Sequence, residues 1–283
     1  MSQLPFNERL LQTVQQTHSH VCVGLDPDPA KLSPVAAESI RTLLEIPAHE
    51  DITHGSLAKA VGQLAGPFAA AFKPNAAFFE AAPNGIADLE SIPSFLHQHA
   101  QGTFTICDAK RGDLANTSQH YAHAIFRKMN YDSITVNPLM GSDSVQPYLD
   151  DPARGVFLLC LTSNPAASEF LLANDLYLRI AEKAVSWNRN KNVGLVVGAT
   201  QAAHAAAIRA VAPELPFLIP GIGAQGGSLP EILDAIQAKS NRRFVINASR
   251  SIMFPEQKLG ELYTKAVSRS AKTLRDEINS LLG

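Results

Sequence analysis

Short apolar runs recur along the chain, and most of them end near glycine, proline, aspartate or asparagine. Runs of this length and composition are typical of buried strands. They occupy residues 20–26, 68–75, 102–110, 133–138, 155–163, 192–200, 216–223 and 243–250. Segments with the spacing of helices lie between them, including residues 115–130, 169–190, 201–212 and 228–240. This alternation predicts parallel strands joined by crossover helices.

The number of these units favours a closed barrel over an open sheet. Eight units in about 250 residues match a (β/α)8 TIM barrel, whereas a doubly wound sheet more often has about five to seven strands and a nucleotide fingerprint at its start. We therefore predict an α/β fold with one (β/α)8 barrel domain over residues 1–283. An amphipathic helix is expected within residues 1–20, and an insert with an extra helix at about 30–66.

The composition is that of an ordinary globular enzyme. Hydrophobic residues make up 46% of the chain and charged residues 18%, and the net charge is −2. No nucleic-acid partner is expected, because the chain lacks the basic excess of such proteins. Residues 192–208 are too short and too polar to span a membrane, and residues 1–20 lack the apolar core of a signal peptide. We expect a cytoplasmic protein without a membrane partner.

Cysteine and histidine spacing predicts neither disulfides nor a metal site. Cys22, Cys107 and Cys160 lie far apart, each inside an apolar run, which favours reduced and buried thiols. His120 and His123 could share a helix face, but no third ligand with metal-site spacing accompanies them.

Polar residues stand at the carboxyl ends of the predicted strands, where the chemistry of a (β/α)8 barrel is carried out. In chain order they are Asp26, Lys73, Asn75, Asp108, Lys110, Asn137, Ser163, Gln225 and Arg250. A phosphate is often held after strands seven and eight of this fold, near the last two of these residues.

Charge is densest in the stretch CDAKRGDLANTS at residues 107–118. Side chains alternate along a strand, so Asp108 and Lys110 should face one side, within reach of Lys73 on the neighbouring strand. Such a cluster shifts the pKa of each member and suits catalysis, although a salt-bridge network that only closes the barrel would look the same. Asp113 could belong to the site or could be the N-cap of the following helix.

Three glycines near the seventh strand form a G-x-G-x-x-G spacing at Gly221, Gly223 and Gly226. A dinucleotide site would place this motif in the first βαβ unit and an acidic residue about 20 positions later. The position here favours a backbone cradle for one phosphate, completed by Arg250. Turn geometry alone, with Arg250 as a surface residue, is the alternative.

Together these stretches resemble one enzyme family. DAKRGD at 108–113, Asp26 in VGLDPDP, Lys73 in FKPN, PGIGAQGG and NASR resemble, in order from residue 20 to about 252, orotidine 5′-phosphate decarboxylase, in particular its longer bacterial (type 2) branch. Asp-x-Lys-x-x-Asp alone is less specific, because sugar-phosphate lyases on the same barrel share it.

The resemblance implies decarboxylation of orotidine 5′-phosphate to uridine 5′-phosphate, the last step of pyrimidine nucleotide synthesis, without metal or cofactor. Lys110 would protonate the C6 carbanion, beside Asp108 and Lys73. Asp113 and Thr117 would reach the partner's site in a homodimer. The substrate-binding residues implied are Asp26 for ribose, Ser163 for the pyrimidine, and Gln225 and Arg250 for the phosphate.

Other functions remain open from the residues. A magnesium-dependent sugar-phosphate lyase or decarboxylase could hold a metal between Asp108 and Asp113. A Schiff-base aldolase could use Lys110 or Lys73 as its nucleophile. A barrel that only binds a phosphorylated nucleotide is the non-enzymatic alternative. The insert at about 30–66 and the segment after the fifth predicted strand have no assigned role.

Overall fold

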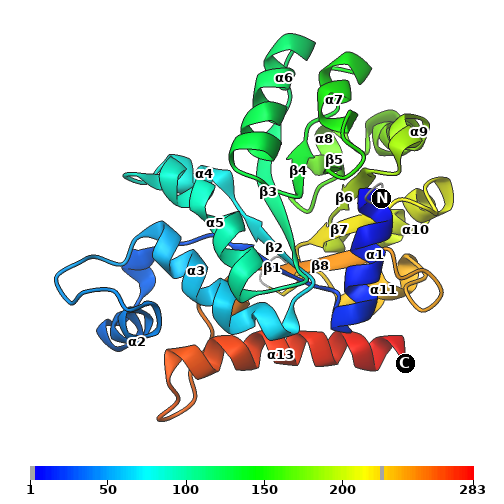
Figure 1. Cartoon of the computed structure of the whole chain (residues 1–283). Helices are drawn as coiled ribbons and strands as arrows, with labels where there is room; N and C mark the ends of the chain where they lie inside the picture. Colours follow the sequence, from blue (N-terminus) through cyan, green and yellow to red (C-terminus); the bar gives the residue numbers. More distant parts are fainter. Residues whose placement is uncertain (1–3, 224–225) are drawn as a thin grey trace.

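The computed structural model describes residues 4–223 and 226–283, and within them eight parallel strands close into a barrel in chain order (Figure 1). The strands are β1 Val21–Leu25, β2 Ala71–Pro74, β3 Phe104–Arg111, β4 Ser133–Val136, β5 Gly155–Leu161, β6 Val193–Val197, β7 Phe217–Pro220 and β8 Phe244–Ala248. Each lies in one of the predicted runs, except that β3 extends by one residue to Arg111. The predicted (β/α)8 barrel is confirmed.

Alternate strand residues fill the inside of the barrel. Ile106, Phe157, Leu218 and Val245 belong to one buried cluster there, and each is at most 1% exposed. A second and larger cluster packs the outer faces of the strands against the helices. Burial on both faces explains why the strand sequences are continuous apolar runs.

Helix α1, Phe6–Thr17, closes the amino-terminal end of the barrel. The Phe6 ring packs edge to face against Phe104 and Phe157, with centroids 5.2 and 5.9 Å apart. A Cβ atom on Gly155 would lie 2.3 Å from that ring, so glycine leaves the room that Phe6 occupies. The helix predicted within residues 1–20 therefore completes the core.

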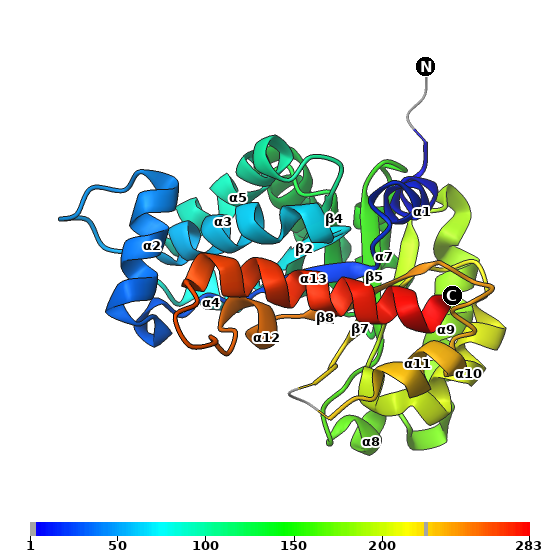
Figure 2. The ribbon, with the colours of Figure 1, turned by 90° about the horizontal axis from the view of Figure 1, so that it is seen from below.

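The remaining helices surround the barrel (Figures 1 and 2). They are α2 Pro34–Leu44, α3 His54–Ala65, α4 Ala76–Glu80, α5 Gly85–His99, α6 Ala115–Ala122, α7 Ser142–Leu149, α8 Ala167–Phe170, α9 Leu176–Trp187, α10 Ala202–Val211, α11 Leu229–Ala235, α12 Arg250–Met253 and α13 Tyr263–Leu282. Helix α13 lies along α3 and contacts α2 and α11.

The region of the predicted insert contains α2 and α3, separated by a loop. Ser33 caps α2 by accepting from the Ala36 N–H, and Thr53 caps α3 by accepting from the Ser56 N–H. Each cap satisfies a backbone donor that the first helical turn leaves unpaired. Helix α2 stands at the outer edge of the molecule in Figure 2.

Residues 169–190 do not form one helical segment, contrary to the sequence prediction. Asn174 and Asp175 adopt left-handed backbone angles, with φ of 50° and 54°, between α8 and α9. Asn and Asp tolerate this conformation better than other residues with side chains, so the interruption is encoded locally. Within the described ranges, no helix is long and apolar enough to cross a membrane.

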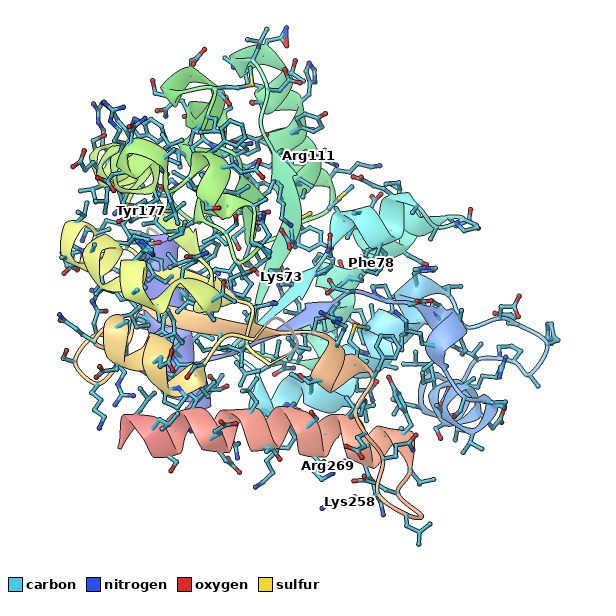
Figure 3. All side chains as sticks on the ribbon, turned by 180° about the vertical axis from the view of Figure 1, so that it is seen from behind. Lys73, Phe78, Arg111, Tyr177, Lys258 and Arg269 are labelled. Carbon is cyan, nitrogen blue, oxygen red and sulfur yellow. The ribbon has the colours of Figure 1, made fainter. Side chains whose placement is uncertain are left out.

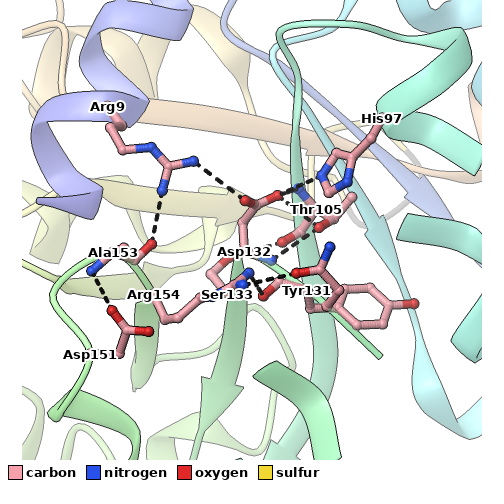
Figure 4. A network of polar contacts seen from close by, with 10 residues as sticks. Arg9, His97, Thr105, Tyr131, Asp132, Ser133, Asp151, Ala153 and Arg154 are labelled. Carbon is pink, nitrogen blue, oxygen red and sulfur yellow. Dashed lines mark hydrogen bonds and ion pairs between the residues drawn. The ribbon is translucent and has the colours of Figure 1, made fainter. Parts of the chain in front are cut away.

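A buried polar network ties α1 to the amino-terminal ends of β3 and β4 (Figure 4). Asp132 accepts hydrogen bonds from the Thr105 N–H and hydroxyl, at 2.9 and 2.8 Å, and lies 3.5 Å from the Arg9 guanidinium. His97 Nε2 lies 3.3 Å from the same carboxylate. Burial would raise the pKa of Asp132, but the hydrogen bonds from His97 and Thr105 hold that pKa below its usual range. In this fold, polar groups at this end serve stability.

Candidate active site

Three charged side chains meet at the carboxyl ends of β2 and β3. Lys73 Nζ lies 2.5 Å from Asp108 Oδ2, and Lys110 Nζ lies 2.7 Å from Asp108 Oδ1. Lys73 and Asp108 are buried, whereas the Lys110 side chain is 50% exposed at the barrel mouth. Figure 3 shows Lys73 near the middle of the barrel. The predicted Lys/Asp/Lys cluster therefore forms within one chain.

The cluster keeps its members charged. Burial would raise the pKa of Asp108, but the ammonium groups of Lys73 and Lys110 hold that pKa well below its usual range. Burial would lower the pKa of Lys73, and the carboxylates of Asp108 and Asp26 raise it above its usual value instead. Asp108 is thus a fixed anion between two cations, of which only Lys110 is open to the mouth.

The backbone that brings Asp108 and Lys110 together is not a regular strand. Pairing of β3 with β4 shifts between Cys107 and Arg111, and Lys110 has a φ of +46°. Simple alternation along β3 was therefore the wrong reason for their proximity, although the proximity itself is present. A bulge redirects the Lys110 side chain onto Asp108, a common device beside active sites.

Thr135 on β4 contacts this bulge, and sequence reasoning missed it. Its hydroxyl donates to Asp108 Oδ1 at 2.8 Å and accepts from the Lys110 N–H at 3.0 Å. Side chains alternate along a strand, so Thr135 should face the same side as Asn137, which stands at the carboxyl end of the same predicted strand. This spacing was the signal that could have identified Thr135. A buried threonine in an apolar strand looks like packing until its neighbours are known.

The expected phosphate site lies across the barrel, where β7 and β8 end. Asp26, Gly221, Ile222 and Arg250 are among the residues that line a cavity of about 120 Å³. The remaining lining residues are Pro220, Asn247, Ala248, Ser249 and Ser251. Arg250 is exposed, as a side chain that meets a ligand from solvent would be. Gln225 lies outside the described residues.

The glycines of the β7 turn adopt backbone angles that other residues rarely reach. The φ values of Gly221, Gly223 and Gly226 are 101°, 74° and 85°. The N–H groups of Gly226 and Gly227 donate to the carbonyls of Gly223 and Gly221 within the turn. These two groups are committed to the turn itself, so a phosphate in this cavity needs other donors, such as Arg250.

Asp26 carries a buried carboxylate oxygen without a partner. No donor among the described residues reaches its Oδ1, while its backbone N–H lies 3.0 Å from Met253 Sδ. An unpaired buried acceptor costs free energy, so this oxygen is suited to a ligand hydroxyl. Asp26 also lies close enough to raise the pKa of Lys73, which places it between the cavity and the charge cluster.

Ser163 lies just after β5, beside a third part of the barrel mouth. Its carbonyl accepts from the Thr200 hydroxyl at 3.0 Å, and a Cβ atom on Gly198 would lie 2.7 Å from its backbone. Its neighbours Thr162 and Asn164 line a cavity of about 270 Å³ together with Leu159. An apolar wall with amide and hydroxyl groups at its rim can accept a flat heterocycle.

Asp113 and Thr117 stand apart from the charge cluster. Asp113 Oδ1 accepts from the adjacent Leu114 N–H at 2.7 Å, and its side chain forms no hydrogen bond or ion pair with Lys110 or Asp108 among the described residues. Asp113 is not the N-cap of α6, because Leu114 occupies that position without a side-chain cap. The N-cap alternative is thus wrong. Both side chains are partly exposed where β3 leads into α6.

The thiols near the site are inert. Burial raises the pKa of both Cys22 and Cys107 to about 12, so neither supplies a thiolate nucleophile near neutral pH. Cys22, Cys107 and Cys160 are all free and buried, as expected. The described residues contain no group of three His, Cys, Asp or Glu side chains arranged to hold a metal ion.

Comparison with known proteins identifies the family. A model described as orotidine 5′-phosphate decarboxylase / HUMPS family matches residues 19–261. The chain belongs to this family. Curated orotidine 5′-phosphate decarboxylases of Dehalococcoides mccartyi and Azoarcus are similar to it. The first is 38% identical over 98% of both chains, and the second is 40% identical over 94% of this chain and 95% of the other.

Similar solved structures support the assignment to the orotidine 5′-phosphate decarboxylase family. The OMP decarboxylase of Leishmania donovani has a TM-score of 0.75 and 34% identity, covering 99% of each chain. The UMP synthase of the same organism has a TM-score of 0.79 and 36% identity, and this chain covers 57% of it. The resemblance found in the sequence is confirmed at the level of the family, and the branch stays a prediction.

Proposed function

We propose that Lys110 is the proton donor of this chain, which decarboxylates orotidine 5′-phosphate to uridine 5′-phosphate in pyrimidine nucleotide synthesis. The observation that carries this mechanism is the half-exposed Lys110 ammonium, held 2.7 Å from a buried carboxylate at the barrel mouth. Family membership supports the reaction, and the geometry of the charge cluster supports the role of the lysine.

The reaction needs a cation close to one carbon atom. When the bond between C6 and the carboxylate breaks, the electron pair stays on C6 and CO₂ leaves. That pair lies in the plane of the pyrimidine ring, so the ring π system cannot delocalise it. A nearby ammonium stabilises it electrostatically and then transfers a proton to C6. Lys110 would do both, and water at the barrel mouth would reprotonate it.

Asp108 and Lys73 prepare this step. Asp108 binds the Lys110 ammonium and fixes its position before the substrate arrives. Lys73 compensates the buried charge of Asp108 from the other side, and we assign to it a further contact with the ribose. Placing Asp108 beside the substrate carboxylate would also disfavour the bound substrate relative to the transition state.

The ribose and phosphate would lie toward β1, β7 and β8. The unpartnered Asp26 Oδ1 is suited to accept from a ribose hydroxyl. Arg250 would hold the phosphate, together with Gln225. Ser163 would contact the pyrimidine on the opposite side of the mouth. In this arrangement the substrate would extend across the barrel mouth from the phosphate cavity to the end of β5, and its C6 atom would lie over Lys110.

The active unit is a homodimer in this proposal. Leu114, Leu139 and Met140 are 63%, 59% and 49% exposed on the loops after β3 and β4. Leu114 follows Asp113 directly in the chain, and exposed apolar side chains on the loops of a barrel mouth are typical of contact surfaces. A second copy docked there would carry Asp113 and Thr117 toward its partner's Lys110.

The experiment that tests the reaction is simple. Purified protein, stripped of metal and assayed in excess chelator, is mixed with orotidine 5′-phosphate while the absorbance of the orotate ring is followed. Rapid loss of that absorbance is expected. Activity that depends on added Mg²⁺ would instead favour the lyase with a metal between Asp108 and Asp113. A covalent adduct trapped by borohydride would favour the aldolase.

The remaining expectations belong to the same proposal. A cytoplasmic location and the lack of a nucleic-acid partner stay predictions. Cell fractionation and a binding assay with mixed nucleic acids would test them.

A further inference from the structure

We infer that Thr135 is a positioning residue for the decarboxylation, because its hydroxyl holds Asp108 and the backbone of Lys110 in one arrangement. The inference rests on the proposed role of Lys110. Thr135 belongs to β4, is 1% exposed, and was not among the residues expected from the sequence.

The contacts around Thr135 form a closed ring. The Lys110 N–H donates to Thr135 Oγ1 at 3.0 Å, and this hydroxyl donates to Asp108 Oδ1 at 2.8 Å. The Lys110 ammonium returns to the same Oδ1 at 2.7 Å. Both ends of Lys110 are therefore tied to one carboxylate oxygen, the ammonium directly and the amide through the Thr135 hydroxyl.

The bulge explains why a hydroxyl is required at this position. Cys107 pairs with Ile134 and Arg111 pairs with Val136, so three residues of β3 face Thr135 alone on β4. A left-handed residue other than glycine is strained, and it persists only where its surroundings hold it. Thr135 supplies the acceptor for the Lys110 N–H at the centre of this irregular stretch. A hydrocarbon side chain there would leave that donor and one site of the carboxylate unpaired.

The consequence for the reaction is geometric. Asp108 Oδ1 accepts from two donors, the Lys110 ammonium and the Thr135 hydroxyl. The hydrogen bond from the hydroxyl fixes the orientation of the carboxylate that binds the ammonium. Without it, the carboxylate and the bulge could rotate, and the ammonium would leave the position that C6 requires. Misplacement of a catalytic group by about 1 Å can cost about 100-fold in rate.

Three variants separate this role from simple packing. Thr135→Val keeps the shape of the side chain and removes the hydroxyl, Thr135→Ala removes the hydroxyl without β-branching, and Thr135→Ser keeps the hydroxyl. Ser133→Ala is the matched control. Ser133 lies two residues earlier on β4 and is also buried, and among the described residues its hydroxyl donates one long hydrogen bond, of 3.4 Å, to the Thr105 carbonyl.

The readout is the split between kcat and KM for orotidine 5′-phosphate, with the fold checked by circular dichroism. Thr135→Val and Thr135→Ala should lower kcat by about 10- to 100-fold, as expected for loss of one hydrogen bond to a charged group. KM should stay within about threefold, because Asp26 and Arg250 are untouched. Thr135→Ser and Ser133→Ala should keep kcat within about threefold of the unmutated protein.

Three results would overturn the inference. They are kcat of both hydroxyl-free variants within threefold of the native value, a Thr135→Ser variant as slow as those variants, or an effect confined to KM. If Thr135→Val does not fold, the comparison of Thr135→Ala with Thr135→Ser decides. Absence of native turnover would instead refute the proposed function, so the two failures are distinguishable.

Discussion

Lys73 and Asp108 form an ion pair of 2.5 Å in which the side chains are only 7% and 8% exposed. They come from neighbouring strands, β2 and β3, and the second oxygen of Asp108 binds the half-exposed Lys110. Two buried charges this close compensate each other's loss of hydration. The site is therefore stable only while both are present and ionised.

Replacing Lys73 should destabilise the whole fold. Lys73→Met leaves the Asp108 carboxylate buried with one half-hydrated partner, and breaking a buried pair in this way costs about 3–5 kcal/mol. Urea unfolding at pH 7 measures the free energy. Lys272→Met is the control, because Lys272 forms an exposed pair with Asp276 and its loss should cost about 0.5 kcal/mol or less. Equal changes in the two variants would contradict a stabilising role of the buried pair.

The phosphate assignment predicts a selective defect in Arg250→Ala. Loss of a guanidinium–phosphate contact should cost about 1.5–3 kcal/mol in kcat/KM for orotidine 5′-phosphate. Orotidine without phosphate should react poorly with the native protein, and the substitution should leave kcat/KM for orotidine nearly unchanged. Arg243 lies at the opposite end of β8 and pairs with Glu214, so Arg243→Ala should leave kcat/KM unchanged for both substrates. A similar loss for both substrates would place Arg250 outside the phosphate site.

The shared-site proposal predicts complementation between inactive subunits. Lys110→Ala and Asp113→Ala proteins should each be inactive, and their mixture should regain activity after subunit exchange. A hybrid dimer contains one site with neither defect, so about a quarter of all sites should be intact at equal mixing. Exchange is followed with differently tagged subunits. A mixture that exchanges yet stays inactive would show that Asp113 does not act across an interface.

His20 makes the fold sensitive to acid. Its ring stacks on Phe244, with centroids 4.0 Å apart, and its Nδ1 lies 2.9 Å from the Phe244 carbonyl oxygen. Burial lowers the pKa of His20 from 6.5 to about 4. Between these values the unfolded chain binds more protons than the folded one, so the free energy of unfolding falls as the pH falls.

The His20 contribution can be isolated by substitution. His20→Asn keeps a donor toward the Phe244 carbonyl and cannot titrate. Between pH 7 and pH 4.5, the native protein should lose about 2 kcal/mol more stability than this variant, as measured by urea unfolding. Titration of carboxylates such as Asp132 contributes equally to the stability loss of both proteins, so it cancels when the two losses are subtracted. Parallel loss in the two proteins would mean that His20 does not resist protonation in the fold.

Much of the fold could be predicted because its signals are local. Apolar runs locate all eight strands, and both faces of the strands are buried over most of their length, so packing does not override the pattern. The prediction of one helical segment over residues 169–190 was wrong, because the left-handed backbone angles at Asn174 and Asp175 leave the hydrophobic pattern unchanged. The cluster of Lys73, Asp108 and Lys110 was foreseen because all three stand at strand ends.

Other parts of the site depend on long-range pairing that the sequence does not display. The bulge at Lys110 arises from the register between β3 and β4, and Thr135 gains its contacts only through that register. The same holds for Asp26, whose unpaired oxygen reflects what surrounds it after folding. Asp113 was ambiguous because an N-cap and a residue that reaches another subunit occupy the same place, just before a helix.

The central claim is that Lys110 supplies both the cation and the proton at C6, and Lys110→Ala tests it most directly. The assay follows decarboxylation of orotidine 5′-phosphate by native and variant proteins whose circular dichroism spectra agree. The account predicts that turnover falls by about 1,000-fold or more, equivalent to about 4 kcal/mol of barrier. It also predicts that Lys110→Arg fails, because a guanidinium does not readily release a proton. Residual activity of Lys110→Ala within about tenfold of native, or about 1.4 kcal/mol, would contradict the assignment of Lys110 as the donor.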